Sequence, residues 1–310
     1  MPGDRRGHDV LTRLGRRKTV REFAGRVAVI TGAASGFGRE FARIAASLGM
    51  RVVLADIEPA PLDAVAAELR AGGCEVLAER VDVSRAADVE RLASRSVECF
   101  GAVHLLFNNA GVAGGGGLIW ESTVNDWTWV LGVNLWGVIH GVRCFVPLML
   151  RQGDACHVVN TASAAGLISA QTMGVYNVSK HAVVTLTETL YHDLRLAGGN
   201  VGVSLLCPAF VDTGIAEADR NRPAELRDAA PPTPSQRAAR AAAAKATASG
   251  RLSAADVARL TFDAIRDDRF YVITHPRILQ SVELRLQDIA AQRQPSDPFS
   301  FKQDVAFKAG

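Results

Sequence analysis

A tyrosine and a lysine four residues apart, Tyr176 and Lys180, are the pair of side chains best suited to acid–base chemistry. In residues 174–196 the apolar side chains recur at the helical period, so both groups should project from the same side of a helix. A free phenol has a pKa of about 10, too high for a base at neutral pH. A neighbouring ammonium stabilises the phenolate and brings that pKa toward neutrality. The spacing alone also fits an unremarkable helix surface.

A glycine-rich turn is the second candidate site. Gly32, Gly36 and Gly38 follow the apolar run 27–31 and open the amphipathic stretch 39–48. Glycines let the backbone approach a pyrophosphate, and a helix N-terminus offers unpaired N–H groups to it. Asp56 ends the next apolar run, where a carboxylate can accept hydrogen bonds from ribose hydroxyls. Taken singly, the turn could be a packing device and Asp56 a helix cap.

The elements that must hold these residues alternate regularly along the chain. Short β-branched runs separated by amphipathic stretches predict buried parallel strands covered by helices on both faces. The predicted strands are residues 27–31, 51–56, 75–78, 104–108, 157–161, 201–206 and 270–274. The fold class is therefore α/β, a doubly wound parallel sheet of about seven strands, or Rossmann fold, with its ligand at the carboxyl ends of the strands.

The domain organisation follows from where this alternation stops. Residues 1–24 read as a basic arm, 25–275 as the Rossmann-type catalytic domain, and 276–310 as a C-terminal helix and tail. Residues 212–251 interrupt the pattern with prolines and an alanine-rich helical run at 237–248. We interpret this insertion as a substrate lid rather than a surface excursion, because long ordered loops are usually functional. Ser253 and Asp256 resemble a capping box that starts the next helix.

Composition excludes several classes of protein. Of 310 residues, 48% are hydrophobic and 22% charged, as in a globular domain, and no uninterrupted apolar run approaches the length of a membrane span. The chain has a net charge of +3, and residues 1–22 alone have a net charge of +4. The remaining residues therefore sum to −1, which does not indicate nucleic-acid binding. The charged N-terminus does not read as a secretory signal, and the basic arm gives only a weak case for a membrane.

Cysteine usage points to the cytoplasm. The five cysteines are dispersed and contain no Cys-x-x-Cys pair, which suits reduced thiols better than disulfides or a zinc site, and we expect no metal. They are Cys74, Cys99, Cys144, Cys156 and Cys207.

Together the motifs resemble the short-chain dehydrogenase/reductase family, in its smaller single-domain branch, over roughly residues 25 to 275. Each motif is modest alone, but their order and spacing are specific. The matching positions are Gly32, Gly36 and Gly38, then Asn108 to Gly111, Asn134, Ser163, Tyr176 and Lys180.

The resemblance implies a role for each position. Tyr176 is expected to be the general acid/base, and Lys180 to lower its pKa and hold the nicotinamide ribose. Ser163 would hydrogen-bond the substrate oxygen, and Asn134 would hold a water in a proton relay from Lys180 to solvent. The residues assigned to the cofactor are Gly32, Ser35, Gly36, Phe37, Gly38, Asp56, Asp82, Val83, Asn108, Asn109, Ala110, Gly111, Tyr176, Lys180, Pro208, Val211 and Thr213.

The cofactor is expected to be NAD rather than NADP, because Asp56 would repel the additional phosphate. Ser35 stands where NADP-using relatives often carry a basic residue, and Arg39 is the one candidate counter-charge. Ala209 replaces the glycine usual in the family, and since alanine does not readily adopt positive φ, the carboxamide-binding loop is expected to shift slightly.

The expected activity is hydride transfer between nicotinamide and a secondary alcohol or ketone, in a homo-oligomer (tetramer or dimer). Alternatives are a cofactor-sensing regulator with an inactive Rossmann domain, and an epimerase or dehydratase of the extended branch. The substrate is expected to be bulky and apolar, with Arg220 and Arg222 as the nearest cations, and residues 114–117 to form a flexible loop at the cofactor edge. The expected pocket walls are residues 164–168 with Leu167 and Ile168, Met173, Phe210, Ile215 and Trp120.

Overall fold

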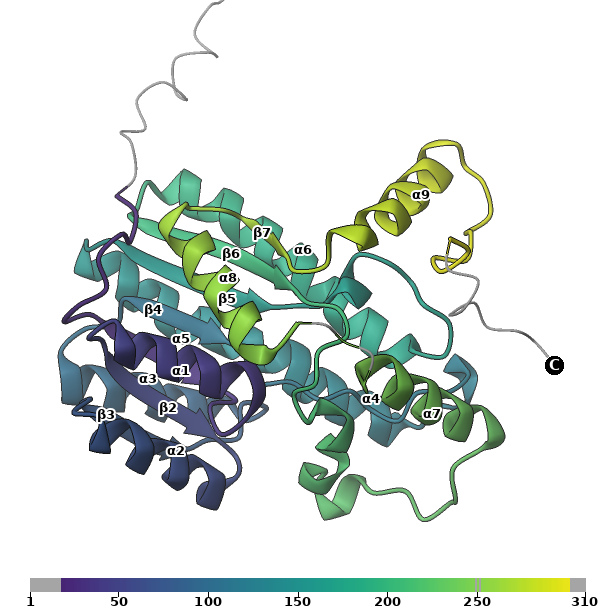
Figure 1. Ribbon diagram of the computed structural model, residues 1–310, viewed down its shortest axis with the longest axis horizontal. Helices are drawn as coiled ribbons and strands as arrows, with labels where there is room; N and C mark the ends of the chain where they lie inside the picture. Colours follow the sequence, from purple (N-terminus) through teal and green to yellow (C-terminus); the bar gives the residue numbers. More distant parts are fainter. Residues whose placement is uncertain (1–17, 249, 251, 302–310) are drawn as a thin grey trace, which may run out of the picture.

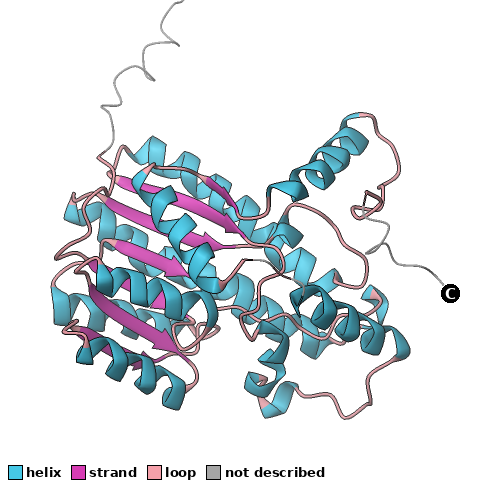
Figure 2. Cartoon of the chain, viewed as in Figure 1, coloured by secondary structure: helices cyan, strands magenta, loops and turns pink. Residues whose placement is uncertain are grey.

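The computed structural model describes residues 18–248, 250 and 252–301, and these form a seven-stranded sheet, parallel throughout, with helices on both faces (Figures 1 and 2). The strand order is β3-β2-β1-β4-β5-β6-β7, which confirms the predicted doubly wound architecture. The strands are β1 (Val27–Thr31), β2 (Arg51–Asp56), β3 (Val76–Arg80), β4 (Leu105–Asn108), β5 (Cys156–Thr161), β6 (Val201–Cys207) and β7 (Tyr271–Ile273).

Two layers of helices bury the sheet, because successive side chains of a strand point to opposite faces. In β1, Ala28 and Ile30 pack toward one helix layer, and Val27 and Val29 toward the other. The first layer consists of α1 (Gly36–Ser47), α2 (Pro59–Ala71) and α8 (Ala254–Arg266). The second consists of α3 (Ala86–Phe100), α5 (Gly137–Gln152) and α6 (Gly174–Ala197).

The crevice for a ligand follows from the strand order. The chain runs outward from β1 through β2 to β3, then returns to the centre at β4 and continues in the opposite direction. Loops leaving β1 and β4 therefore diverge at the carboxyl edge of the sheet and leave an opening there.

One long helical segment deserves comparison with a membrane span. By length and a mean hydropathy of 1.4, Val124–Gln152 is the one helix of the described residues apolar enough to cross a bilayer. It comprises α4 (Val124–Leu131), the π-turn η2 (Gly132–Trp136) and α5. The side chains of Phe145 and Met149 are fully buried against the sheet, so the segment serves here as a core helix of the α/β domain.

The insertion predicted at 212–251 folds into three helical pieces. They are η4 (Ile215–Asn221), η5 (Ala224–Leu226) and α7 (Pro234–Ala248). Helix α7 packs on the glycine run 114–117, where a Cβ on Gly117 would lie 2.6 Å from Cγ of Gln236 and one on Gly116 would lie 2.9 Å from Cβ of Ala239. The run therefore forms a closely packed seat for α7 rather than the flexible loop we expected.

The capping box predicted at the start of α8 is present. The Ser253 side chain accepts from the Asp256 backbone N–H, and the Asp256 carboxylate accepts from that of Ser253. After β7, η6 (Pro276–Ile278) leads into α9 (Leu279–Ala290), which projects from the body in Figure 1. The following segment folds back on α9, with the Ser281 hydroxyl donating to the Pro298 carbonyl.

The N-terminal boundary lies earlier than predicted. Val20 is fully buried and Phe23 nearly so, with its ring edge-on to that of Phe262 at 5.5 Å. The backbone N–H of Lys18 donates to the side chain of Asn200. Val20 and Phe23 therefore pack into the core although the arm was expected to extend to residue 24, while residues 1–17 lie outside the described residues.

Truncating Val20 tests this boundary. Val20→Ala removes two buried methyl groups and should lower the free energy of unfolding by about 1–2 kcal/mol. Denaturant unfolding measures the change, with the exposed neighbour Arg21→Ala as control, expected to lie within about 0.5 kcal/mol of the parent. Equal stabilities for both variants would show that this segment is not part of the core.

Candidate active site

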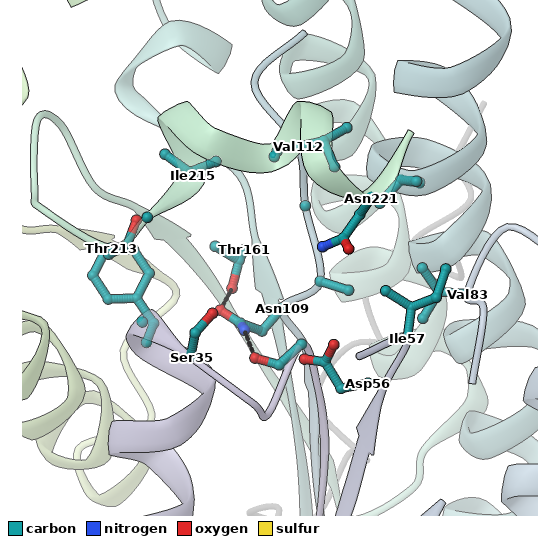
Figure 3. A pocket seen from close by; sticks show the side chains of 18 of the residues that line it. Ser35, Asp56, Ile57, Val83, Asn109, Val112, Thr161, Thr213, Ile215 and Asn221 are labelled. Atoms are coloured by element: carbon teal, nitrogen blue, oxygen red, sulfur yellow. Dashed lines mark hydrogen bonds between the residues drawn. The ribbon is translucent and has the colours of Figure 1, made fainter. Parts of the chain in front are cut away.

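A deep cleft lies at the carboxyl edge of the sheet. It holds about 1160 Å³ of empty space, open solvent included, and is lined from the ends of β1, β2, β4, β5 and β6. Figure 3 shows Ser35, Asp56 and Asn109 on the sheet side, with η4 crossing above them. Residues far apart in sequence meet here because parallel strands place all their carboxyl ends at one edge.

The glycine turn is shaped by two close approaches and by backbone with positive φ. A Cβ on Gly38 would lie 1.9 Å from the carbonyl oxygen of Gly32, so only glycine allows α1 to pack this near to β1. Gly32 and Gly36 both have positive φ, at 66° and 50°, and a Cβ on Gly36 would lie 2.9 Å from that of Thr213. The result is an open cradle at the N-terminus of α1.

Asp56 lies at the end of β2 with its carboxylate in the cleft (Figure 3). One oxygen accepts from the backbone N–H of Ala34 at 2.9 Å and the other from that of Glu58 at 3.0 Å. Burial raises the pKa of Asp56, and these two hydrogen bonds oppose that effect. Each oxygen keeps a second lone pair, so the group can still accept hydroxyl donors.

Glu58, which sequence analysis missed, binds the insertion across the cleft. Its carboxylate accepts from Arg220 Nη2 at 2.6 Å and from the Asn221 amide at 2.6 Å. The hydrogen bond from Arg220 holds the pKa of Glu58 below its ordinary value. Its position two residues after Asp56, the carboxylate predicted to bind the cofactor, was the only signal in the sequence, and that signal does not reveal a partner 162 residues away.

Asn108, the last residue of β4, and Asn109, which follows it, make different contacts. Asn109 joins the turns of β1 and β4, because its backbone N–H donates to the Thr31 hydroxyl at 2.9 Å and its side chain donates to the Thr31 carbonyl at 3.0 Å. Asn108 points away from the cleft and donates to Asn160 at 2.8 Å inside the sheet. The expected adenosine-side contact therefore falls to Asn109.

Helix α6 brings Lys180 beside Tyr176, as its i, i+4 spacing predicted. The ammonium nitrogen of Lys180 lies 5.7 Å from the centre of the Tyr176 ring and donates to the Thr161 carbonyl at 2.9 Å. Ser163 lies two residues after the end of β5, and its hydroxyl donates to the Pro208 carbonyl at 3.3 Å. The three side chains thus meet where β5 ends.

Burial displaces both pKa values away from the ordinary ones. It raises the pKa of the Tyr176 phenol, while a hydrogen bond with Ser163 acts in the opposite direction. It lowers the pKa of Lys180 to about 8, against a smaller effect of the Cys207 thiol. That Lys180 brings the phenol's pKa down stays a prediction, and burial of the phenol acts in the opposite direction.

Asn134 lies in the π-turn η2 and is fully buried. Its side chain accepts from the Val112 backbone N–H at 2.8 Å and donates to the Val112 carbonyl at 2.9 Å and to Ser179 at 3.1 Å. The amide therefore fixes the loop after β4. Turns of this kind are frequent at functional sites, since they disturb the regular helical hydrogen bonds.

Most residues predicted for the cofactor line the cleft, and three do not. Asn108 and Val211 are buried in the core, and Gly38 serves helix packing. Ala209 does not adopt positive φ, so alanine fits this position without backbone strain. Among the described residues, those with positive φ other than glycine are Thr172, Asp268 and Gln292. The predicted residues that line the cleft are Gly32, Ser35, Gly36, Phe37, Asp56, Asp82, Val83, Asn109, Ala110, Gly111, Tyr176, Lys180, Pro208 and Thr213.

These features fit a dinucleotide. The glycine cradle admits a pyrophosphate against the N-terminus of α1, and Asp56 offers acceptors to a ribose. Within the described ranges, no group of three or more His, Cys, Asp or Glu side chains could hold a metal ion.

Comparison with known proteins agrees with this geometry. A family model described as short chain dehydrogenase matches residues 26–224. The chain belongs to the short-chain dehydrogenase/reductase family. It is an oxidoreductase of that family by this match, with the Rossmann fold that the strand order already indicated.

Relatives cover most of the chain. A crystal structure of a Burkholderia phymatum short-chain dehydrogenase/reductase in complex with NAD is 62% identical, has a TM-score of 0.88, and is matched over 90% of this chain and 99% of its own. A CLA biosynthesis dehydrogenase/reductase of Lactiplantibacillus plantarum is 33% identical over 89% of this chain and 97% of its own. A metagenomic short-chain oxidoreductase in complex with NADP is 33% identical, with a TM-score of 0.57, over 60% of this chain and 82% of its own.

A second cavity of this dehydrogenase/reductase adjoins the cleft at Tyr176, which lines both. It holds about 730 Å³, open solvent included. Most of its wall is glycine, alanine, valine and methionine, from the run 114–116, Met173 and the insertion. Arg240 of α7 also lines it, so the cation at this cavity is Arg240 rather than Arg220 or Arg222, which were expected to be the nearest.

The other expected walls are mostly elsewhere. Trp120 is 77% exposed, Ile168 is buried in the fold, and Ile215 lines the first cleft instead. Arg220 and Arg222 are both held in ion pairs with protein carboxylates.

The buried ammonium of Lys180 predicts a pH-dependent stability. Since its pKa is about 8 in the folded protein against about 10.4 unfolded, the unfolded chain binds more protons between those values. This contribution makes the folded state more stable as pH rises through that window. Lys180→Met removes it, so the stability of the variant relative to the parent should fall by up to about 3 kcal/mol from pH 8 to pH 10.4.

Denaturant unfolding of both proteins, without added cofactor, measures this difference. Lys245→Met on the exposed side of α7 is the control and should track the parent at every pH. A difference between Lys180→Met and the parent that stays constant over the window would show that Lys180 is not desolvated as described.

Proposed function

We propose that this protein is an NAD(H)-dependent dehydrogenase/reductase that acts on a secondary alcohol or ketone with a largely apolar body. The observation that carries the proposal is that Tyr176 lines both the dinucleotide cleft and the adjoining apolar cavity. A single acid/base group thus stands where two ligands meet. A cofactor-sensing regulator would not need this arrangement, whereas the interconversion of alcohol and ketone that is typical of the family does.

The proton is moved by Tyr176. When bound, the nicotinamide accepts or supplies the hydride. In oxidation the phenolate takes the hydroxyl proton of the alcohol as the carbon–hydrogen bond breaks, and in reduction the phenol returns that proton to the ketone oxygen. Ser163 has its hydroxyl beside the phenol and donates to the substrate oxygen, which stabilises the negative charge that develops there.

Lys180 and Asn134 complete the proton path. The ammonium favours the phenolate relative to a neutral neighbour, and its Thr161 partner fixes its position. It also holds the nicotinamide ribose. Because the Asn134 side chain is engaged by Val112 and Ser179, a relay water is held through the backbone of the π-turn.

Charge at the adenosine end favours NAD. Asp56 faces the ribose position, while Arg220, the cation that lines the cleft there, is neutralised by Glu58. Asp56 therefore keeps its negative charge at the ribose position, and it repels a 2′-phosphate. Arg39, the earlier candidate counter-charge, lies 3.6 Å from Glu40 and is not a lining residue. The NAD complex of the 62% identical relative supports this preference.

The insertion serves as a lid in this proposal. Its η4 segment crosses the cleft and is tied to the sheet side by Glu58, while α7 walls the second cavity. We also propose a cytoplasmic homo-oligomer, a dimer or tetramer. The exposed apolar side chains of Val124 and Trp136 on the helix after β4 support an oligomer, and the free cysteines of the described chain support the compartment.

Tyr176→Phe tests the chemistry. Loss of the proton donor should lower kcat by about 10² to 10⁴-fold while fluorescence titration shows unchanged NADH binding. Tyr191→Phe, on the same helix but outside both cavities, is the control and should keep full activity. Turnover by Tyr176→Phe within threefold of the parent would refute the assignment.

Cofactor preference tests the placement of Asp56. The parent should use NAD with a kcat/KM at least about tenfold above that for NADP, since an unscreened phosphate about 4 Å from a carboxylate is repelled by about 4 kcal/mol at an effective dielectric of 20. Asp56→Ala should shrink that ratio toward one. Asp63→Ala, on the exposed face of α2, should leave it unchanged. Equal kcat/KM for the two cofactors in the parent would contradict the proposal.

A further inference from the structure

The ionic side chains that line the second cavity are not equally neutralised by their partners. Its lining is small and apolar apart from a few polar groups, and two lining residues are ionic, Arg240 and Asp126. Asp126 is already neutralised. Its carboxylate lies 2.7 Å from Arg222 Nη1, with both side chains about 10% exposed, and it caps the start of α4 through Thr123.

Arg240 is held differently. Its Nη2 lies 3.2 Å from one oxygen of Asp219, and both side chains are about half exposed. Within the part of the chain that the structure describes, Asp219 is its one ion-pair partner. Exposed pairs of this geometry contribute about 0–1 kcal/mol, so the contact is readily exchanged.

The fold positions this guanidinium over the cavity. Helix α7 rests on the glycine run, and a Cβ on Gly115 would lie 3.8 Å from Arg240 Nη2. Side chains on the run would collide with α7 at Gly116 and Gly117, so the glycines let the helix approach closely enough for Arg240 to line the cavity.

We propose that Arg240 binds a carboxylate carried by the substrate, at the end of the apolar cavity away from the reacting carbon. The proposal rests on the proposed function and specifies its substrate class as an oxo- or hydroxy-acid with an apolar body. The guanidinium offers a planar pair of N–H donors that match a carboxylate, and the substrate displaces Asp219 from it. A phosphate is the poorer match, because Arg240 is the one cation among the described residues that line the cavity.

A matched substrate series tests this. Methyl ketones with a terminal carboxylate, namely 4-oxopentanoate, 6-oxoheptanoate and 8-oxononanoate, are compared with their methyl esters by NADH consumption. At one spacer length or more, we expect kcat/KM for the acid to exceed that for its ester by at least tenfold, mainly through KM. Esters that are reduced as well as their acids at every length would overturn the inference but leave the proposed function standing.

Three variants assign the effect. Arg240→Gln should remove the advantage of the acid and leave the ester unchanged, whereas Lys245→Gln, also on α7, should change neither. Asp219→Asn should lower KM for the acid severalfold, because it removes the competing carboxylate. If Arg240→Gln or Asp219→Asn alters acid and ester equally, the pair is only a clamp within the insertion and the inference fails.

The proposed function has a separate failure. If the parent reduces none of the acids, none of the esters and none of a panel of neutral aryl and alicyclic ketones, hydride transfer to ketones is wrong, and the result says nothing specific about Arg240. Titration of the acids against Arg240→Gln and the parent by isothermal calorimetry then decides binding alone. Equal affinity would overturn the inference independently of turnover.

Discussion

A buried ammonium constrains the centre of this molecule. Lys180 is 2% exposed and cannot be left without a partner, because an isolated charge in a protein interior is very costly. The Thr161 carbonyl at the end of β5 satisfies it and so ties helix α6 to the sheet. The loop after β4 passes close by, since a Cβ on Gly111 would lie in contact with the ammonium nitrogen at 3.6 Å and with Asn134 at 3.4 Å. Tyr176, Asn134 and the turn at Gly111 all lie around that contact.

Burial shifts the pKa values of Tyr176 and Lys180 in opposite directions. It favours the neutral forms of both, so the phenol holds its proton more firmly and the ammonium less firmly than in water. The same dry surroundings strengthen every electrostatic interaction with groups that enter the site. A charge that enters the cleft therefore acts more strongly on Tyr176 than it would at a wet surface.

The insertion is attached by contacts of two kinds, and their difference matters for function. The Arg222–Asp126 pair is about nine-tenths buried and lies beside the ring of Trp129, so breaking it would leave a buried charge. The Glu58–Arg220 and Arg240–Asp219 pairs are more exposed, particularly on the arginine side, and exchange more easily. The insertion is thus anchored at Arg222, whereas Arg220 and Arg240, which line the two cavities, are held by more exposed pairs.

Sequence alone determined the sheet, the glycine cradle and the Tyr176–Lys180 pair, because strand alternation, close backbone approach and helical spacing are local properties. Most of the residues that it assigned to the cofactor line the cleft. The sequence did not reveal that Val20 is in the core, that Glu58 reaches Arg220, or that Arg240 faces the substrate cavity. Those contacts join segments far apart in the chain, and an arginine on a mostly alanine helix looks the same in sequence whether it faces water or a cavity. Only the packing of α7 on the glycine run decided which it is.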